Sequence, residues 1–291
     1  FAATFNVSTP AEFQTALDTA RTNNADDTIF VSAGTFNISS TLSYDDSYTA
    51  TPQNYALQII GAGAGLTILD GGGTTLPLYM SAQGGSNASI LIRGITFQNG
   101  YNDDDGGGAY LESYEALVSV ANCIFLSNES GDEGGGLHAR SNDVGVNLFN
   151  NVFQGNTTTS DGSYGGGAYV DSYEGTMNVI NNTFIENSAY DEGGGLHVYS
   201  NSSDTSVINI YNNILWNNTS TADGDDLYLF DGSNTESNVF NNDYSDFDRN
   251  GNGSLNQGNN INQNPLLTAD FHLQSGSPAI NTGNNSAPSL P

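Results

Sequence analysis

Short stretches that alternate between apolar and polar residues recur along most of the chain, and each has the period-two pattern of a β-strand. In each repeat one stretch follows a glycine-rich turn directly, and a second apolar stretch comes several residues later. No segment between them is long and apolar enough for a crossover helix, so the strands are expected to stack directly on one another. The predicted strands after the turns are 109–111, 137–139, 168–170, 196–198 and 227–229, and the second set is 117–120, 144–148, 177–180 and 207–210.

A third stretch in each repeat holds one large apolar residue, which in all repeats but the first follows asparagine. These residues are Phe97, Phe125, Phe153, Phe184 and Leu215. Three strands every 28–31 residues make one coil of a parallel β-helix, in which equivalent residues lie about 4.8 Å apart. We therefore expect an internal column of phenylalanine rings, and turns whose asparagines adopt left-handed backbone conformations and pair their amides. The predicted fold class is all-β, with three short strands per coil.

Glycine triplets mark the period. They stand at 106–108, 134–136, 165–167 and 193–195, and Gly224-Asp225-Asp226 is a weaker copy. The surrounding sequence is duplicated at a 59-residue offset, since GGGAY, SYE and DEGGGLH occur in both 106–138 and 165–197. Glycine permits close approaches that a Cβ forbids, and no GxGxxG or Walker pattern with a following helix is present. The triplets are therefore interpreted as architectural.

The ends of the chain break the period. Near the N-terminus, Phe13, Leu17 and Ala20 fall on one helical face, which predicts an amphipathic helix over the open end of the stack. Because the period runs on without a linker, a single domain is expected. Its predicted parts are the capping helix at 8–24, the regular coils at 26–237, and irregular closing coils with a polar tail at 238–291, within one domain of 1–291.

The charge of the chain excludes some partners. There are 32 acidic residues against four arginines and no lysine, and the formal net charge is −28. A chain without a basic surface does not attract nucleic acid or an anionic membrane, so neither is an expected partner. No stretch approaches the roughly 18 apolar residues of a membrane span, so membrane insertion is not expected.

The expected location is extracellular, at the cell surface. The chain begins with Phe1, as a processed, exported protein does, although a segment of a longer protein looks the same. Its one cysteine, Cys123, excludes an intramolecular disulfide and is replaced by Asn182 at the 59-residue offset, so we interpret it as a packed thiol. Asn-x-Ser/Thr sequons such as that at Asn87 leave glycosylation open.

Several segments resemble known families. ADDTIFVSAGTFNI and IIGAGAGLTILDGGG resemble the N-terminal part of pectin-lyase-like parallel β-helices. The GGG-(A/L)-x and N-x-F-x-x-N repeats resemble polymorphic outer-membrane proteins, and NQNPLLTADFHLQSGSPAINTG resembles the closing segment of choice-of-anchor secreted proteins. The resemblance implies a right-handed single-stranded parallel β-helix. It does not fix an activity, because this superfamily holds lyases, hydrolases, adhesins and structural proteins.

The catalytic motifs of the enzymes in that superfamily are not found here. Pectate lyases hold calcium on stacked aspartates beside a catalytic arginine or lysine, whereas this chain lacks lysine and gives Arg93 and Arg140 no evident partners. The Gly-His-Gly and Arg-x-Lys motifs of polygalacturonase-type hydrolases are absent. A two-carboxylate glycosidase needs only two acids, but the candidates are too many to single out. No catalytic residue is assigned.

Acidic residues precede the glycine triplets and are expected to form a column at one turn. Like charges this close raise one another's pKa or bind a cation, and oxygen-rich turns with glycine suit Ca²⁺. A solvated acidic ridge is the alternative. The candidate Ca²⁺ ligands are Asp103, Asp104, Asp105, Asp132, Glu133, Asp191, Glu192, Asp225 and Asp226.

A second candidate Ca²⁺ site matches the D-x-D-x-N-G pattern of a calcium loop through Asp246, Asp248 and Asn250. Gln257 stands where the usual bidentate glutamate is expected, and no flanking helices are predicted. An asparagine- and glycine-rich turn is the alternative interpretation.

Aromatic rings follow the triplets and are expected to stack in a column on the outer face. Two histidines two coils apart would be about 10 Å from each other, too far to share one zinc ion. We interpret the column as a packing or glycan-stacking surface. Its members are Tyr110, His138, Tyr169, His197 and Tyr228.

Together these features predict a non-enzymatic, secreted or cell-surface β-helix with a structural or adhesive role. Flat lateral faces and strand edges at the ends favour a homo-oligomer or homopolymer, such as an extracellular filament or layer. Carbohydrate is the other expected partner. The alternative is a calcium-dependent polysaccharide lyase or glycoside hydrolase that uses acids of the 103–105 or 132–133 turns.

Overall fold

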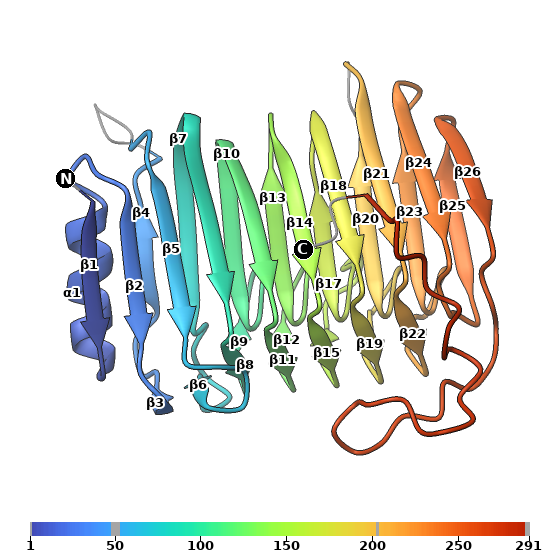
Figure 1. Ribbon diagram of the computed structural model, residues 1–291, viewed down its shortest axis with the longest axis horizontal. Helices are drawn as coiled ribbons and strands as arrows, with labels where there is room; N and C mark the ends of the chain where they lie inside the picture. Colours follow the sequence, from blue (N-terminus) through green and yellow to red (C-terminus); the bar gives the residue numbers. More distant parts are fainter. Residues whose placement is uncertain (1, 48–52, 202–203, 289–291) are drawn as a thin grey trace.

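The structure is a computed structural model that describes residues 2–47, 53–201 and 204–288, and it is a parallel β-helix (Figure 1). Strands of successive coils pair in parallel register: Leu137 pairs with Ala168, and Ala168 pairs with Leu196. These partners are 31 and 28 residues apart, which is the period of the glycine triplets. The predicted all-β fold of stacked coils is confirmed.

Three rows of strands run along the stack. The first row is β4 (Leu42–Asp45), β7 (Leu78–Arg93), β10 (Ala109–Ala121), β13 (Leu137–Ser141), β17 (Ala168–Asp171), β20 (Leu196–Ser200), β23 (Leu227–Asp231) and β25 (Phe247–Gly251). The second row is β1 (Ala3–Val7), β2 (Asp27–Val31), β5 (Ala56–Gly61), the later parts of β7 and β10, β14 (Gly145–Phe149), β18 (Gly175–Ile180), β21 (Ser206–Tyr211), β24 (Thr235–Phe240) and β26 (Ser254–Gly258). The long strands β7 and β10 join the two rows, because each pairs with both.

The third row closes the coil. It consists of β3 (Gly34–Asn37), β6 (Thr67–Asp70), β8 (Thr96–Gln98), β11 (Ile124–Leu126), β15 (Val152–Gln154), β19 (Thr183–Ile185) and β22 (Ile214–Trp216). A short ladder beside it consists of β9 (Tyr101–Asn102), β12 (Glu129–Ser130) and β16 (Thr157–Thr158).

The core is a set of columns made by the inward-facing residues of each row. Phe97, Phe125, Phe153 and Phe184 are fully buried, and their rings stack at centroid distances of 5.0, 4.8 and 4.6 Å. Leu215 continues this column. The alternation seen in the sequence therefore sets the core, since every second residue of a strand faces inward. The predicted phenylalanine column is confirmed.

The turns are stabilised by asparagine ladders and by glycine. The amide of Asn182 donates to Asn213 Oδ1 at 3.1 Å and to the Leu148 carbonyl at 2.9 Å, and equivalent bonds recur in neighbouring coils. Gly134 has φ +70°, and a Cβ on Gly135 would lie 2.4 Å from the Gly166 carbonyl oxygen. A larger residue would push the coils apart, so the triplets are architectural, as predicted.

One helix, α1 (Pro10–Ala20), lies against β1, β2 and β4 at the N-terminal end of the stack (Figure 1). Thr9 is its N-cap and accepts a hydrogen bond from the Glu12 backbone N–H. Phe13 and Leu17 are fully buried against the first coil. Among the described residues, no helix is both long and apolar enough to cross a membrane.

At the other end, pairing continues past residue 237 through β25 and β26, and a parallel bridge between Asp243 and Ile261 extends it beyond Gly258. The segment after it forms turns and folds back along the stack (Figure 1). It contacts the second row's turns through two hydrogen bonds between Asn284 and Asn212, at 2.7 and 3.1 Å.

Candidate functional site

The aromatic column lies on the outer side of the first row, as the sequence predicted. Ring centroids of successive members are 4.9–5.3 Å apart, and Tyr79 extends the column. Its later members are largely buried, however, because the rings cover one another and residues of the preceding turns contact His138 and His197. The exposed fractions are 2% for His138, 6% for Tyr169, 3% for His197 and 4% for Tyr228, whereas Tyr110 is half-buried. For these four rings, burial favours the packing interpretation of the column over glycan stacking.

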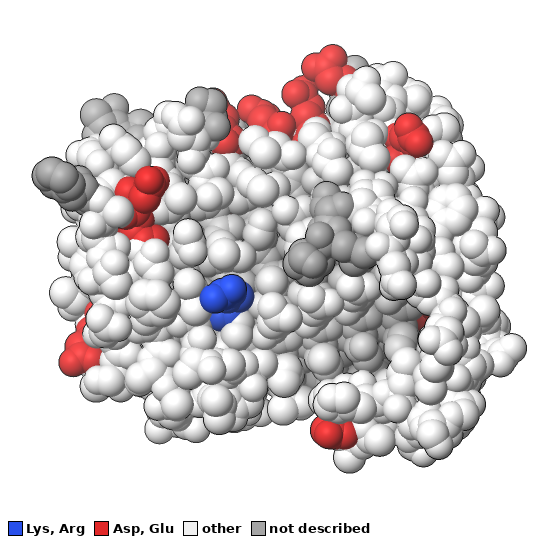
Figure 2. All heavy atoms as spheres, in the orientation of Figure 1, with Lys and Arg blue, Asp and Glu red and all other residues white. Residues whose placement is uncertain are grey.

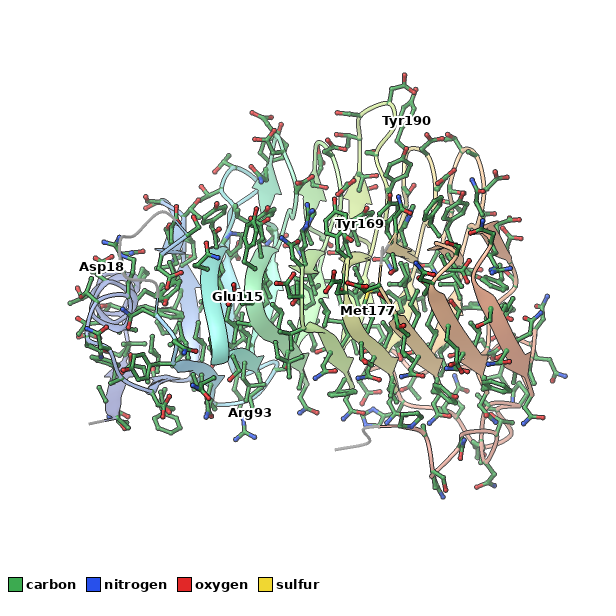
Figure 3. The ribbon with its side chains drawn as sticks, turned by 90° about the horizontal axis from the view of Figure 1, so that it is seen from above. Asp18, Arg93, Glu115, Tyr169, Met177 and Tyr190 are labelled. Carbon is green, nitrogen blue, oxygen red and sulfur yellow. The ribbon has the colours of Figure 1, made fainter. Side chains whose placement is uncertain are left out.

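Next to the covered rings, the same strands form an open groove of about 490 Å³ on this side of the molecule. In Figure 3, Tyr169 lies in the upper half of the rod, and Arg93 projects from the lower side. The groove combines aromatic side chains, three carboxylates and one guanidinium group. It is lined by Glu133, Arg140, Tyr164, Tyr169, Asp171, Tyr173, Glu192, His197, Tyr199, Tyr228, Phe230 and Asn250.

An ion pair lies in the floor of this groove. Arg140 of β13 and Asp171 of β17 are register partners, and Arg140 Nε lies 3.4 Å from Asp171 Oδ2. The ring of Tyr173 lies 5.0 Å from the guanidinium carbon. Asp171 is 5% exposed, and its Oδ1 has no hydrogen-bond partner among the described residues. Burial raises the pKa of Asp171 to about 6 despite the opposing effect of Arg140.

A second cluster joins two acids of the predicted column to one histidine. His138 Nδ1 lies 3.6 Å from Asp105 Oδ2 and 3.6 Å from Glu133 Oε2. Burial raises the pKa of Glu133 to about 8, and the neighbouring carboxylate of Asp105 adds to this effect. Burial lowers the pKa of His138 to about 3, so the ring is neutral near pH 7. In the sequence, the acids and the rings form separate columns, and nothing in the repeat predicts that they meet.

The other acids of the predicted column have different surroundings. Asp103, Asp104 and Asp132 line a second hollow of about 780 Å³ together with Asp105, Tyr79 and Tyr110. Asp191 and Glu192 are half-buried at the turn before Gly193, and Glu192 borders the groove.

Asp225 and Asp226 stabilise the turn in which they lie. The buried carboxylate of Asp226 accepts hydrogen bonds from Asn218 Nδ2 at 2.8 Å and from Ser245 N and Oγ at 2.7 Å. Asp225 Oδ1 accepts from Ser220 N at 2.6 Å. Asp226 therefore ends the asparagine ladder, since its lone pairs are already used by donors of the chain.

The predicted D-x-D-x-N-G loop is absent, because its residues form strand β25 and the turn before it. Asp248 and Asn250 pair in register with Tyr228 and Phe230 of β23. Asp246 and Asp248 accept hydrogen bonds from the backbone N–H groups of Asp225 and Gly224. Residues 247–251 are extended, so the loop on which this Ca²⁺ prediction depends is not formed, and within 247–253 a turn is present only at Asn252 and Gly253, after the strand.

Sequence reasoning missed Asp171 and the partner of Arg140. The signal is present in the repeats, because Glu112, Arg140 and Asp171 each stand two residues after a column ring. The register pairs Glu112 with Arg140 and Arg140 with Asp171. The position two residues after each column ring therefore predicts that these three charged side chains lie side by side on adjacent strands.

Known proteins offer few similarities to this chain. No protein-family model and no curated protein matches the chain. Among solved structures, the chain is similar to ORF18 of Geobacillus virus E2, with 12% sequence identity and a TM-score of 0.30. The match covers 87% of this chain and 56% of that one. At this TM-score the similarity supports no conclusion about fold or function, so the groove and the cluster are interpreted from their own chemistry.

Proposed function

We propose that the protein is a secreted, rod-like glycan-binding protein of the cell surface that holds a sugar chain in the groove across β13, β17, β20 and β23. The observation that carries this proposal is the groove itself, which brings aromatic and polar side chains together on a rigid parallel sheet. Tyrosine suits this role because an apolar ring and a polar hydroxyl occur in one stiff side chain. The function is then binding and architecture rather than catalysis.

The charges of the site favour a neutral glycan. Asp171 and Glu192 outnumber the single cation of the groove, Arg140, whereas Glu133 is largely protonated at pH 7 because its pKa is about 8. The net charge of the chain is −28. An acidic polysaccharide would meet like charge along the whole approach. Carboxylates and a guanidinium group can accept from and donate to sugar hydroxyls, which gives the groove its polar specificity.

Two matched ring pairs allow this proposal to be tested. Tyr199 and Phe230 stack at 4.7 Å in the groove, whereas Tyr211 and Phe240 stack at 5.6 Å on the second row. All four rings are partly exposed. We expect the Tyr199→Ala/Phe230→Ala variant to bind a neutral polysaccharide about tenfold more weakly, and the Tyr211→Ala/Phe240→Ala variant to bind it normally.

The measurement is retention on a panel of immobilised neutral and acidic polysaccharides, followed by titration calorimetry with the glycan retained best. Equal losses in both variants, or no retention of the wild-type protein on any neutral glycan, would overturn the proposal. Tighter binding to acidic glycans would contradict the charge argument.

A polysaccharide hydrolase or lyase is the second candidate, and the pairing of Asp171 with Arg140 favours it. A carboxyl group with a raised pKa beside a cation, in an open groove, is a common arrangement for acid–base chemistry. An enzyme would release new reducing ends from the glycan, and unsaturated products would identify a lyase. The Asp171→Asn variant should then lose activity while it still binds. No release of reducing ends by the wild-type protein would exclude this candidate.

Self-association is part of the proposal. Within the part of the chain that the structure describes, β1 pairs only with β2, and β26 pairs only with β24. Such strand edges can pair with another copy. Sedimentation velocity over a wide concentration range should show species larger than the 30.6 kDa monomer, and a monomer at every concentration would contradict a filament.

A further inference from the structure

We propose that Asp105, Glu133 and His138 bind one divalent transition-metal ion of the Zn²⁺ class, at the junction of the two hollows on the first row. Asp105 lines the larger hollow, and Glu133 lines the groove. The three residues come from two adjacent coils, and the stacking of the coils brings them together. The site shares Glu133 with the groove, but the proposal does not depend on glycan binding.

The distances fit a metal ion better than a hydrogen-bond network. One ligand atom from each residue lies within 4.8 Å of the other two, and His138 Nδ1 is 3.6 Å from an oxygen of each acid. A distance of 3.6 Å is too long for a hydrogen bond. Two ligand atoms bound tetrahedrally at about 2.1 Å from Zn²⁺ are about 3.4 Å apart. The two distances from His138 Nδ1 therefore match the spacing of ligands around an ion.

His138 gives an independent observation that points to a ligand. The residue is 2% exposed, and neither ring nitrogen has a hydrogen-bond partner among the described residues. An unpaired buried polar group costs free energy, and native proteins rarely leave one. Stacking between Tyr110 and Tyr169 holds the ring in place. An ion bound to Nδ1 would pair this buried atom.

The carboxylates are oriented as well. The backbone N–H of Glu133 donates to Asp105 Oδ1 at 3.0 Å, which leaves Asp105 Oδ2 directed at His138. Such support for a ligand strengthens metal binding. The acid side chains are 28% and 25% exposed, so an ion and one water molecule can reach the cluster from solvent. Arg140 lies nearby, but its charge is paired with Asp171.

The duplicated half of the chain lacks this set of donors. His197 occupies the place of His138, and Glu192 the place of Glu133, but Tyr164 stands where Asp105 stands in the first copy. The ring of Tyr164 lies 5.0 Å from the ring of His197. One carboxylate is thus replaced by an aromatic ring, so the second copy is a natural control within the same molecule.

The donor set selects the class of ion. Ca²⁺ takes six to eight oxygen ligands, whereas this cluster offers one nitrogen and two carboxylates. One imidazole with carboxylates and an open position suits Zn²⁺ and its first-row neighbours. Ca²⁺ was the ion expected from the acids alone, and the buried histidine changes that expectation.

The test is calorimetric titration of the full chain with ZnCl₂, MnCl₂ and CaCl₂ after chelator treatment and dialysis. A His272→Asn background removes the exposed His272–Asp270 pair, which lies at 3.2 Å and could bind zinc at the surface. We expect one Zn²⁺ per chain, a higher melting temperature with Zn²⁺, and much weaker binding of Ca²⁺.

Matched variants identify the ligands. His138→Phe keeps a ring in the column but removes the nitrogen, so it should abolish the binding of one Zn²⁺ per chain. His197→Phe should still bind one Zn²⁺ per chain. Asp105→Asn keeps an acceptor for the Glu133 N–H and should weaken binding at least tenfold, which provides a second test if His138→Phe does not fold. Unchanged Zn²⁺ binding in either site variant, Ca²⁺ binding as tight as Zn²⁺ binding, or no Zn²⁺ binding would overturn the proposal.

Discussion

His197 shows how strongly the surroundings of a single residue control its charge. The residue lies in the aromatic column between Tyr169 and Tyr228, is 3% exposed, and has no hydrogen-bond partner for either ring nitrogen among the described residues. Burial lowers its pKa from 6.5 to about 3. The folded state therefore keeps the imidazole neutral where the unfolded chain binds a proton.

This burial predicts a dependence of stability on pH. A His with a lowered pKa stabilises the fold fully above its unfolded pKa of 6.5, and this contribution is lost as the pH falls toward 3. Relative to His197→Phe, the wild-type protein should lose about 2 kcal/mol of unfolding free energy between pH 7 and pH 5. Urea denaturation at both pH values measures this difference. The contribution of His138 is common to both proteins, so a constant difference would show that His197 is not buried as a neutral ring.

At the scale of elements, the phenylalanine column ties the third row to the core. Phe153 is fully buried and stacks on Phe125 and Phe184 at 4.8 and 4.6 Å. The same column holds Leu215 one coil beyond Phe184. The column therefore accepts a branched aliphatic side chain at its end. At Phe153, which stacks between two other rings, the volume of the ring fills the core.

Two substitutions separate volume from stacking. Phe153→Ala should destabilise the protein by about 3–5 kcal/mol, because it removes buried surface and leaves a cavity. Phe153→Leu should cost clearly less, since leucine already occupies this column in the coil of β22. Chemical denaturation with a check of the transition slope measures both values. Equal losses for the two variants would mean that stacking rather than volume stabilises the column.

The strands and their register could be predicted because period and alternation are local properties of the sequence. Phe125 and Phe153 occupy one column because they are 28 residues apart, and no tertiary information is needed to see this. The burial of the ring column was not predictable in this way. It depends on how the turns before the glycine triplets fold over the strands, and no period encodes the direction of a turn.

The contacts within the candidate metal site could not be predicted from the local sequence either. Asp105 and His138 lie in different columns of the sequence repeat, and only the folded turn brings them to 3.6 Å. For Asp248 and Asn250, a local motif predicted a loop, but pairing with β23 extends the segment into a strand. Long-range pairing outweighed the local pattern there, because the open edge of β23 offers a full row of hydrogen bonds.

At the scale of the whole molecule, the net charge of −28 is distributed unevenly over the rod. The face over β14, β18, β21 and β24 carries few charged side chains, and the acids visible in this view lie mostly near its margins (Figure 2). The second row instead carries a polar asparagine ladder, in which Asn178 Nδ2 donates to Asn147 Oδ1 at 2.8 Å. Acids gather in the turns over the first row, where burial raises the pKa of both Asp132 and Glu133 and the nearby carboxylate of Asp105 adds to the effect.

Such a charge distribution predicts stabilisation by salt. Repulsion between acids is screened over about 10 Å at 0.1 M ionic strength but acts over about 30 Å at 0.01 M. The melting temperature should therefore rise by several degrees between these two concentrations of NaCl, and KCl should have the same effect. A melting temperature that does not change with ionic strength would show that the acids are too far apart, or too well paired, to repel.

The central claim is that a glycan chain lies in the groove of the first row, and a crystal structure of the protein with the best-binding neutral oligosaccharide tests it most directly. We predict sugar rings on Tyr199 and Phe230, with hydroxyl groups hydrogen-bonded to Arg140 or Asp171. An empty groove at saturating oligosaccharide, or sugar bound instead on Tyr211 and Phe240 of the second row, would contradict the account.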